Sequence, residues 1–342
     1  MTHAERILKA AALKPTDRTP FALLSSGTWC IVSRGSNLLD ALSLPAGTVA
    51  NWFYEGYTAA DSDISWGGSG YNNIVVEALG GKVKWRKSGT PDVTETLFKS
   101  AADADVYDHA VISKSSKIQK LYEFTRSLVE KEDGNRLVGG GSWGPFTLAG
   151  LLLGADTLMK SIYRDRAAVE KTLSFTTELY LTYIQGYIDA GAKVILMAEP
   201  SASGDMISRK HFNEVVMPYI KAASRRLADK GVIIILHICG NVSDRLDLIA
   251  ESGVHIMSLD YKVDLTLARD AFAGKIAFSG NLNPVSVVQS GAREEIVRET
   301  IAGIEKVGEG HSYIVMPGCD IPPSTPLENL KLISETVRAY KF

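Results

Sequence analysis

A histidine and a cysteine stand two positions apart, as His237 and Cys239, directly after the apolar run Val232–Leu236. In an extended strand, residues i and i+2 point to the same side, so this imidazole and thiolate can reach one metal ion together. Cys319 follows another apolar run 80 positions later, and a glycine adjoins each of the two cysteines. Two thiolates and one imidazole suit Zn²⁺, and three protein ligands leave one coordination position open, as in catalytic zinc sites. We therefore predict a zinc site at His237, Cys239 and Cys319.

The alternative interpretation is that these side chains only fill the core, because cysteine is among the most buried residue types. A second cysteine at an equivalent strand end favours metal binding over packing. Cys30 has no such context, and we expect it to be buried packing. Three cysteines in 342 residues are too few for a disulfide framework and are typical of a reducing cytoplasm.

Three further polar residues follow apolar runs that read as strands: Glu199, Asp260 and Asn281. In parallel α/β folds the functional groups gather where the strands end. We predict that Glu199 is a catalytic acid or base, or completes the metal shell; a helix-capping role is an equally open interpretation. Asp260 and Asn281 are candidate substrate-binding residues. Either could instead cap the following helix, and we favour such a structural role for Asp260.

From about residue 133 onward, short apolar runs alternate with amphipathic stretches, which is typical of parallel strands in βα units. An earlier strand is expected at Phe21–Ser25, so at least seven strands can be counted, and these favour an α/β fold of the (β/α)8 TIM-barrel type. The other expected strands are Arg136–Gly139, Lys193–Ala198, Val232–His237, His255–Leu259, Lys275–Ser279 and Ser312–Met316. The expected helices between and after them are Val169–Asp189, Ser208–Lys230, Val242–Glu251, Arg293–Val307 and Pro326–Tyr340.

The stretch 26–131 is less regular, with a glycine-rich loop at Trp66–Tyr71 and a hairpin expected around Lys82–Lys87. We interpret it as an N-terminal elaboration, inserted after the first strand, that covers the mouth of the barrel. No Pro- or Ser-rich linker, low-complexity tract or internal repeat divides the chain. The sequence therefore predicts one domain over residues 1–342.

The overall composition narrows the classes of partner. Lys plus Arg number 37 and Asp plus Glu number 39, so the formal net charge is −2, and no basic run of the kind that nucleic-acid binding requires is present. The first twenty residues read as a short amphipathic helix without the apolar core of a secretory signal. The apolar runs are too short to span a bilayer. We expect a cytoplasmic protein that binds neither nucleic acid nor membrane.

At these residues the chain resembles the uroporphyrinogen decarboxylase superfamily, and within it the branch of zinc-dependent corrinoid methyltransferases. The assignment to this branch rests mainly on His237, Cys239 and Cys319, which match the HxC…C zinc motif of its members. The segments that carry the wider resemblance run the length of the chain: Glu5–Ala10, Glu77–Gly81, Gly144–Ala149, Ala190–Ala192, Leu236–Asn241, Gly280–Pro284, Pro317–Cys319 and Thr325–Leu330.

The resemblance implies a barrel whose mouth meets a separate corrinoid protein that carries cobalamin. The DxHxxG signature of corrinoid carriers is absent here, since Asp108 and His109 are adjacent, so the cobalamin is expected on that partner. True uroporphyrinogen decarboxylases use no metal and carry an Arg-rich RQAGRY-like segment, which has no counterpart between Pro20 and Gly70. Metal-free decarboxylation of a porphyrinogen is therefore the weaker alternative.

The implied reaction is methyl transfer between the corrinoid and a small thiol or oxygen compound, because zinc favours the deprotonated, nucleophilic form of its bound substrate. In one direction a thiolate takes the methyl group of methyl-Co(III). In the other, a methyl ether gives its methyl group to Co(I), and the sequence leaves both directions open. A superfamily lyase, and a binding protein whose cysteines only pack, remain the alternatives from other classes.

Overall fold

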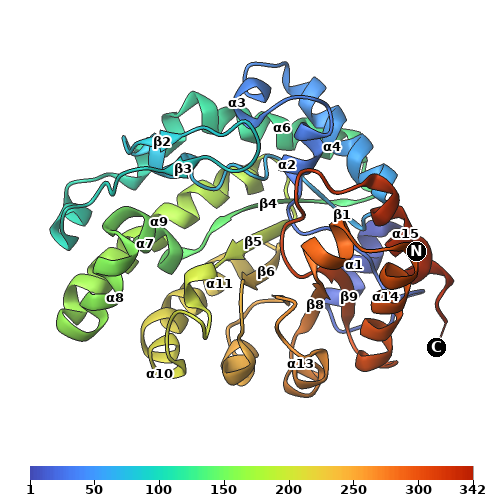
Figure 1. The fold of residues 1–342 in the computed structure, drawn as a ribbon. Coiled ribbons are helices and arrows are strands. Elements are labelled where there is room, and N and C mark those ends of the chain that lie inside the picture. Colours follow the sequence, from blue (N-terminus) through green and yellow to red (C-terminus); the bar gives the residue numbers. More distant parts are fainter. Residues whose placement is uncertain (342) are drawn as a thin grey trace.

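The computed structural model of the protein, which describes residues 1–341, contains a curled sheet of parallel strands surrounded by helices (Figure 1). Seven strands are hydrogen-bonded in the order β1-β4-β5-β6-β7-β8-β9. Their bounds are β1 Ile64–Trp66, β4 Leu137–Trp143, β5 Val194–Ala198, β6 Ile233–Ile238, β7 Ile256–Leu259, β8 Ala277–Leu282 and β9 Tyr313–Pro317. The last six match, within a few residues, the strands expected from the sequence.

The eighth position of the ring is filled by the segment around Phe21, which closes the barrel between β9 and β1. Phe21 forms a parallel bridge with Val315, and the amide of Asp63 donates to the Phe21 carbonyl at 2.7 Å. The segment was expected to be a strand over Phe21–Ser25, but only a single-residue bridge forms. The reason is local: the Phe21 amide is taken by the Asp63 carboxylate at 2.9 Å, and Ser25 has a left-handed backbone with φ of 61°. The (β/α)8 barrel class is confirmed.

Helices cover the outside of the sheet. Three of the five expected helices are present with small shifts at their ends, whereas Val242–Glu251 is a 3₁₀ segment followed by a short α-helix and Ser208–Lys230 contains a π-helical segment. After β4 come α7 Pro145–Leu153, α8 Ala155–Arg164 and α9 Arg166–Asp189. The later ones are α10 Arg209–His211, α11 Met217–Ala228, α12 Leu246–Ile249, α13 Leu265–Phe272, α14 Arg293–Val307 and α15 Leu327–Ala339. Between these helices lie the 3₁₀ segments Pro200–Ala202 and Ser243–Arg245 and the π-helical segments Phe212–Val216 and Pro284–Gln289; the 3₁₀ segments Ala101–Asp105 and His109–Lys114 precede β4. In the described residues, no helix is long and apolar enough to cross a membrane.

The N-terminal helix α1 His3–Ala11 precedes the barrel, and the stretch 26–131 holds more regular structure than its sequence indicated. It contains the barrel strand β1, which sequence analysis missed because three residues are too short for a periodic pattern. It also contains α2 Gly27–Val32, α3 Leu38–Ala41, α4 Ala46–Ala60, α5 Ile74–Ala78 and α6 Ser116–Glu132. The expected hairpin is present as the antiparallel pair β2 Val83–Lys84 and β3 Asp92–Val93.

A buried cluster of charges lies at the end of the barrel where the strands begin. Asp63, which precedes β1, is fully buried and accepts from Arg6 at 2.7 Å, from Arg18 at 3.1 Å and from His3 at 2.6 Å. Burial alone would raise the pKa of Asp63, but its contacts with His3, Arg18 and Arg6 lower that pKa below the ordinary value. These bonds fasten the N-terminal segment to β1 and leave the opposite end of the barrel for the site.

Candidate metal site

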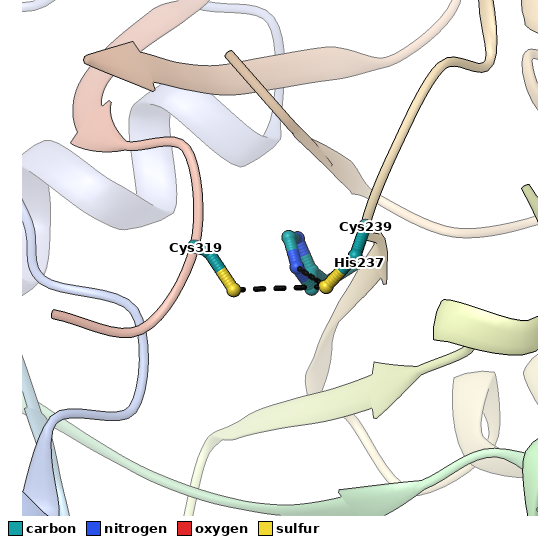
Figure 2. A group of neighbouring side chains, drawn as sticks. All are labelled: His237, Cys239 and Cys319. Atoms are coloured by element: carbon teal, nitrogen blue, oxygen red, sulfur yellow. Dashed lines mark hydrogen bonds between the residues drawn. The ribbon is translucent and has the colours of Figure 1, made fainter. Parts of the chain in front are cut away.

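His237, Cys239 and Cys319 meet where β6 and β9 end (Figure 2). Nε2 of His237 lies 3.1 Å from Sγ of Cys239, which in turn lies 3.6 Å from Sγ of Cys319. All three ligand atoms lie within 4.8 Å of one another, and the three residues form a group with the geometry of a metal site. The three side chains thus lie together, although Cys239 and Cys319 are 80 residues apart in the sequence; metal binding by them stays a prediction.

The imidazole is held so that one particular nitrogen faces the sulfurs. Nδ1 of His237 donates to Ser258, whose carbonyl oxygen lies at 3.2 Å and whose hydroxyl lies at 3.1 Å. Ser258 is the partner of His237 in the parallel register of β6 and β7, so their side chains share the barrel face. A backbone carbonyl that accepts a hydrogen bond from Nδ1–H leaves the Nε2 lone pair free for a metal. Histidine ligands of metal sites are usually oriented by a hydrogen bond of this kind.

The dimensions of the group suit a tetrahedral zinc ion. Zn–S bonds of about 2.3 Å and Zn–N bonds of about 2.0–2.1 Å give an S···S separation of about 3.8 Å and an N···S separation of about 3.6 Å at tetrahedral angles. The S···S separation found here, 3.6 Å, is within about 0.2 Å of that value, and the N···S separation of 3.1 Å needs only a small outward movement. The donors, one imidazole and two thiols, are also the soft set that zinc prefers.

The contact between the two thiols makes one of them easier to ionise and the other harder. The hydrogen bond from Cys239, and then the contact with His237, lower the pKa of Cys319 below the ordinary thiol value. The same hydrogen bond, followed by burial, raises the pKa of Cys239. Without a cation the second proton therefore leaves with difficulty, whereas a metal ion stabilises both thiolates at once.

The loop 260–263, which follows β7, lies between the two cysteine-bearing segments. Asp260 is only 5% exposed, and its carboxylate accepts from the Gly240 amide at 2.8 Å and the Lys262 amide at 3.0 Å. On the other side, a Cβ added to Gly318 would lie 2.6 Å from the Tyr261 nitrogen, so the backbone before Cys319 presses on the same loop. The loop therefore spaces the segment of Cys239 from that of Cys319.

The side chain of Asn281, from β8, is directed at this loop. Its Nδ2 donates to the Asp260 carbonyl at 3.1 Å and to the Val263 carbonyl at 2.6 Å. The contacts made by Asp260 and Asn281 are thus to backbone groups around the metal site. Substrate binding by either residue stays a prediction.

Glu199 directs its carboxylate to the start of α7. It is fully buried and accepts from the Phe146 amide at 2.9 Å and from the amide and hydroxyl of Thr147 at 2.8 and 2.7 Å. Burial raises the pKa of Glu199 to about 7, although these hydrogen bonds oppose the shift. The carboxylate satisfies the free amides of a helix N-terminus, which is the capping interpretation of this residue. Its catalytic role stays a prediction, and it is not in the His–Cys–Cys group.

Two features of the site were not identified from the sequence. Ser258 could have been found, because it is the one polar residue in the apolar run of β7. The ion pair of Lys262 with Asp205, at 2.9 Å, could not, because its partners lie in loops after different strands. Asp205 also accepts from the Asn241 amide at 3.3 Å, so this pair joins three of the loops around Cys239.

Comparison with known proteins places the chain in a family. The profile of the uroporphyrinogen decarboxylase (URO-D) family matches residues 2–340, and the chain therefore belongs to that family. Among its relatives, methylcobamide:CoM methyltransferase MtbA of Methanosarcina acetivorans is 27% identical over 252 residues, covering 74% of this chain and 72% of the relative. A uroporphyrinogen decarboxylase of Syntrophotalea carbinolica is 26% identical over 270 residues, covering 77% of this chain and 76% of the relative.

The fold is shared with solved structures. A methyltransferase from Methanosarcina mazei superimposes with a TM-score of 0.89 at 23% identity, covering 99% of this chain and 98% of the other. A B12-independent methionine synthase from Shewanella sp. W3-18-1 superimposes with a TM-score of 0.53 at 13% identity, covering 86% of each chain. At these identities the likeness bears on the fold alone.

Proposed function

We propose that this protein catalyses methyl transfer between a corrinoid and the sulfur atom of a small thiol, at a Zn²⁺ ion held by His237, Cys239 and Cys319. The observation that carries the proposal is the convergence of one imidazole and two thiols, within 4.8 Å, at the end of the barrel where the strands finish. Relatives that bear the name methylcobamide:CoM methyltransferase support the reaction class.

The chain's own residues would do three things in this reaction. His237, oriented by Ser258, offers Nε2, while the two cysteines offer thiolates, so the protein supplies three of four tetrahedral positions. The loop 260–263 keeps the two sulfurs at their spacing. A zinc ion at this position would favour the deprotonated, nucleophilic form of a thiol substrate. The cobalamin is proposed to arrive on a separate corrinoid protein.

The ion pairs of the N-terminal arginines support methyl transfer rather than decarboxylation of a porphyrinogen. That alternative needs cations in the mouth for the substrate's carboxylates. Arg6 and Arg18 are instead bound to Asp63, at the end of the barrel where the strands begin, and Arg34 is paired with Glu55. None of the three is thus available to bind a substrate in the mouth.

The first test is metal content, combined with a paired activity assay. Protein purified without added zinc should carry about one zinc per chain, because three soft ligands converge at one point. Cys239→Ala and Cys319→Ala should each lose most of the metal and keep the fold, whereas Cys30→Ala, at a buried cysteine outside the group, should keep the metal. Full zinc occupancy in Cys319→Ala would remove that residue from the site.

The activity assay distinguishes the direction of transfer. Methylcobalamin is incubated with a panel of thiols, and Co(I) corrinoid protein with a panel of methyl ethers, and the cobalamin spectrum is followed. We expect zinc-dependent turnover with thiols. Turnover in the ether panel alone would make this the demethylating component, and no turnover in either panel with an intact zinc site would refute the proposed methyltransferase.

A further inference from the structure

The charges around the metal site bear on which thiols it can accept. We define the mouth loops as the segments that follow the barrel strands: residues 22–45, 67–73, 144, 199–208, 239–245, 260–264, 283–292 and 318–326. In sequence they hold seven acidic residues and three basic ones, so their formal charge is negative by four. The metal does not offset this charge, because two thiolates neutralise a dication.

Each of the three cations in the mouth loops already has a partner. Arg34 is paired with Glu55 on the exposed surface. Arg245 is fully buried and donates to the Ala202 and Ile207 carbonyls at 2.9 Å each. Lys262 lies in the loop after β7, and Asp205 accepts a hydrogen bond from its ammonium at 2.9 Å.

After β1, the next lysine or arginine in the sequence is Lys82, at the hairpin β2–β3. The hairpin is fastened to the outer helices, since Trp85 donates to Glu77 of α5 at 3.2 Å and Lys117 of α6 lies 4.9 Å above the Trp85 ring. Two of its cations are paired within the hairpin, Lys82 with Glu95 and Arg86 with Asp92. The other two, Lys84 and Lys87, are exposed on the hairpin surface.

Three buried or half-buried carboxylates of the mouth loops, in contrast, have no ion-pair partner. Asp260, Glu199 and Asp320 are in no ion pair within the part of the chain that the structure describes. The Asp260 carboxylate is bound only by backbone amides, and one of them, the Gly240 amide at 2.8 Å, adjoins Cys239, so this carboxylate lies beside the candidate ligands. The Lys262–Asp205 pair cancels its own charge, so Asp260 leaves the surroundings of the site negative.

We propose that the small substrate of this site has an uncharged or cationic tail, and that thiols with an anionic tail, including coenzyme M, are disfavoured. The inference rests on the proposed methyltransferase function and names its substrate class. A site with complementary charge attracts its ligand and repels like charge, and burial strengthens both effects. A sulfonate beside the thiol would enter a negative field without a free cation to receive it, whereas an ammonium would enter a favourable one.

The test is a series of three two-carbon thiols that differ only in the charge of the tail: coenzyme M with a sulfonate, 2-mercaptoethanol with a hydroxyl and cysteamine with an ammonium. The kcat/KM of the zinc-loaded protein with methylcobalamin is measured for each thiol and normalised to the thiol's uncatalysed rate. We expect coenzyme M to be the poorest acceptor, by at least tenfold, and the difference to shrink at high salt as screening increases. Binding of each thiol to Co(II)-substituted protein, read from the thiolate-to-cobalt absorbance, should give the same order.

The outcomes separate this inference from the proposed function. Methylation of all three thiols with coenzyme M as the best acceptor would overturn the charge argument and leave the methyltransferase standing. Methylation of none, with zinc bound, would refute both. Equal efficiencies for the three thiols would also overturn the inference.

A charge variant tests the cause. Asp205→Asn removes the partner of Lys262 and frees a cation beside the Cys239 loop, so the normalised kcat/KM for coenzyme M should rise severalfold relative to that for 2-mercaptoethanol. The matched control is Asp270→Asn in the last turn of α13, which removes one exposed carboxylate away from the mouth and should leave the preference unchanged. An unchanged preference in Asp205→Asn would contradict the electrostatic basis.

Discussion

Replacement of Asp260 by alanine should weaken metal binding while leaving the fold intact. The carboxylate holds the Gly240 amide, next to Cys239, and the Lys262 amide, and it is almost fully buried. Its loss would leave two amides without their acceptor and free the Cys239 loop from the loop 260–263. The position of Cys319 should also change, because the preceding residue, Gly318, packs closely against the same loop.

The size of the effect follows from the two hydrogen bonds. A buried donor left without its partner costs about 1–3 kcal/mol. We expect about 1.4–2.8 kcal/mol of this cost to appear in metal binding, because the Gly240 amide adjoins a ligand; that is about a 10- to 100-fold loss of zinc affinity. The same range is typical when the outer support of a metal ligand is removed.

Zinc affinity would be measured by competition with a chromophoric chelator, and the ligand geometry by the d–d spectrum of the Co(II) form. Asp264→Ala is a suitable control, because Asp264 also accepts a backbone amide, that of Thr266 at 2.7 Å, but caps α13. It should lower the free energy of unfolding by about 1 kcal/mol and leave zinc affinity unchanged. If Asp260→Ala binds zinc as the wild type does and only loses stability, the positioning role is wrong.

Two further variants test the buried carboxylates. Asp63→Ala leaves the buried Arg6 and the half-buried Arg18 without their shared anion. It should cost about 3–5 kcal/mol of unfolding free energy in urea titrations. A cost below about 1 kcal/mol would show that the cluster does not hold the N-terminal segment. Burial raises the pKa of Glu199 in the folded wild type above its ordinary value of 4.5, so the wild type should lose about 3 kcal/mol of stability as pH rises from about 4.5 to about 7. Glu199→Gln has no such group, and its stability relative to wild type should therefore increase over the same range. A stability difference independent of pH would contradict the raised pKa.

The barrel could be predicted from the sequence because its later strands carry a strong local signal. Five-residue apolar runs such as β5 and β9 are buried throughout, and amphipathic helices of ordinary length separate them. Strand β1 and the bridge at Phe21 lack that signal. Their place in the ring depends on long-range bonds, such as that of Phe21 to Asp63, which no local pattern encodes.

The proximity of His237 and Cys239 could be predicted for a further reason, which also explains why the direction of the Glu199 side chain could not. His237 and Cys239 share one face of their segment by simple alternation, so their spacing alone brings them together. Ala198 is the register partner of His237 and therefore shares that face, which turns the next residue, Glu199, to the opposite side and toward α7. Position after a strand places a residue at the mouth, but only the register between strands decides whether it faces the metal or the helix layer. The same register brings Ser258 to His237, so the support of the imidazole follows from pairing between strands rather than from any motif.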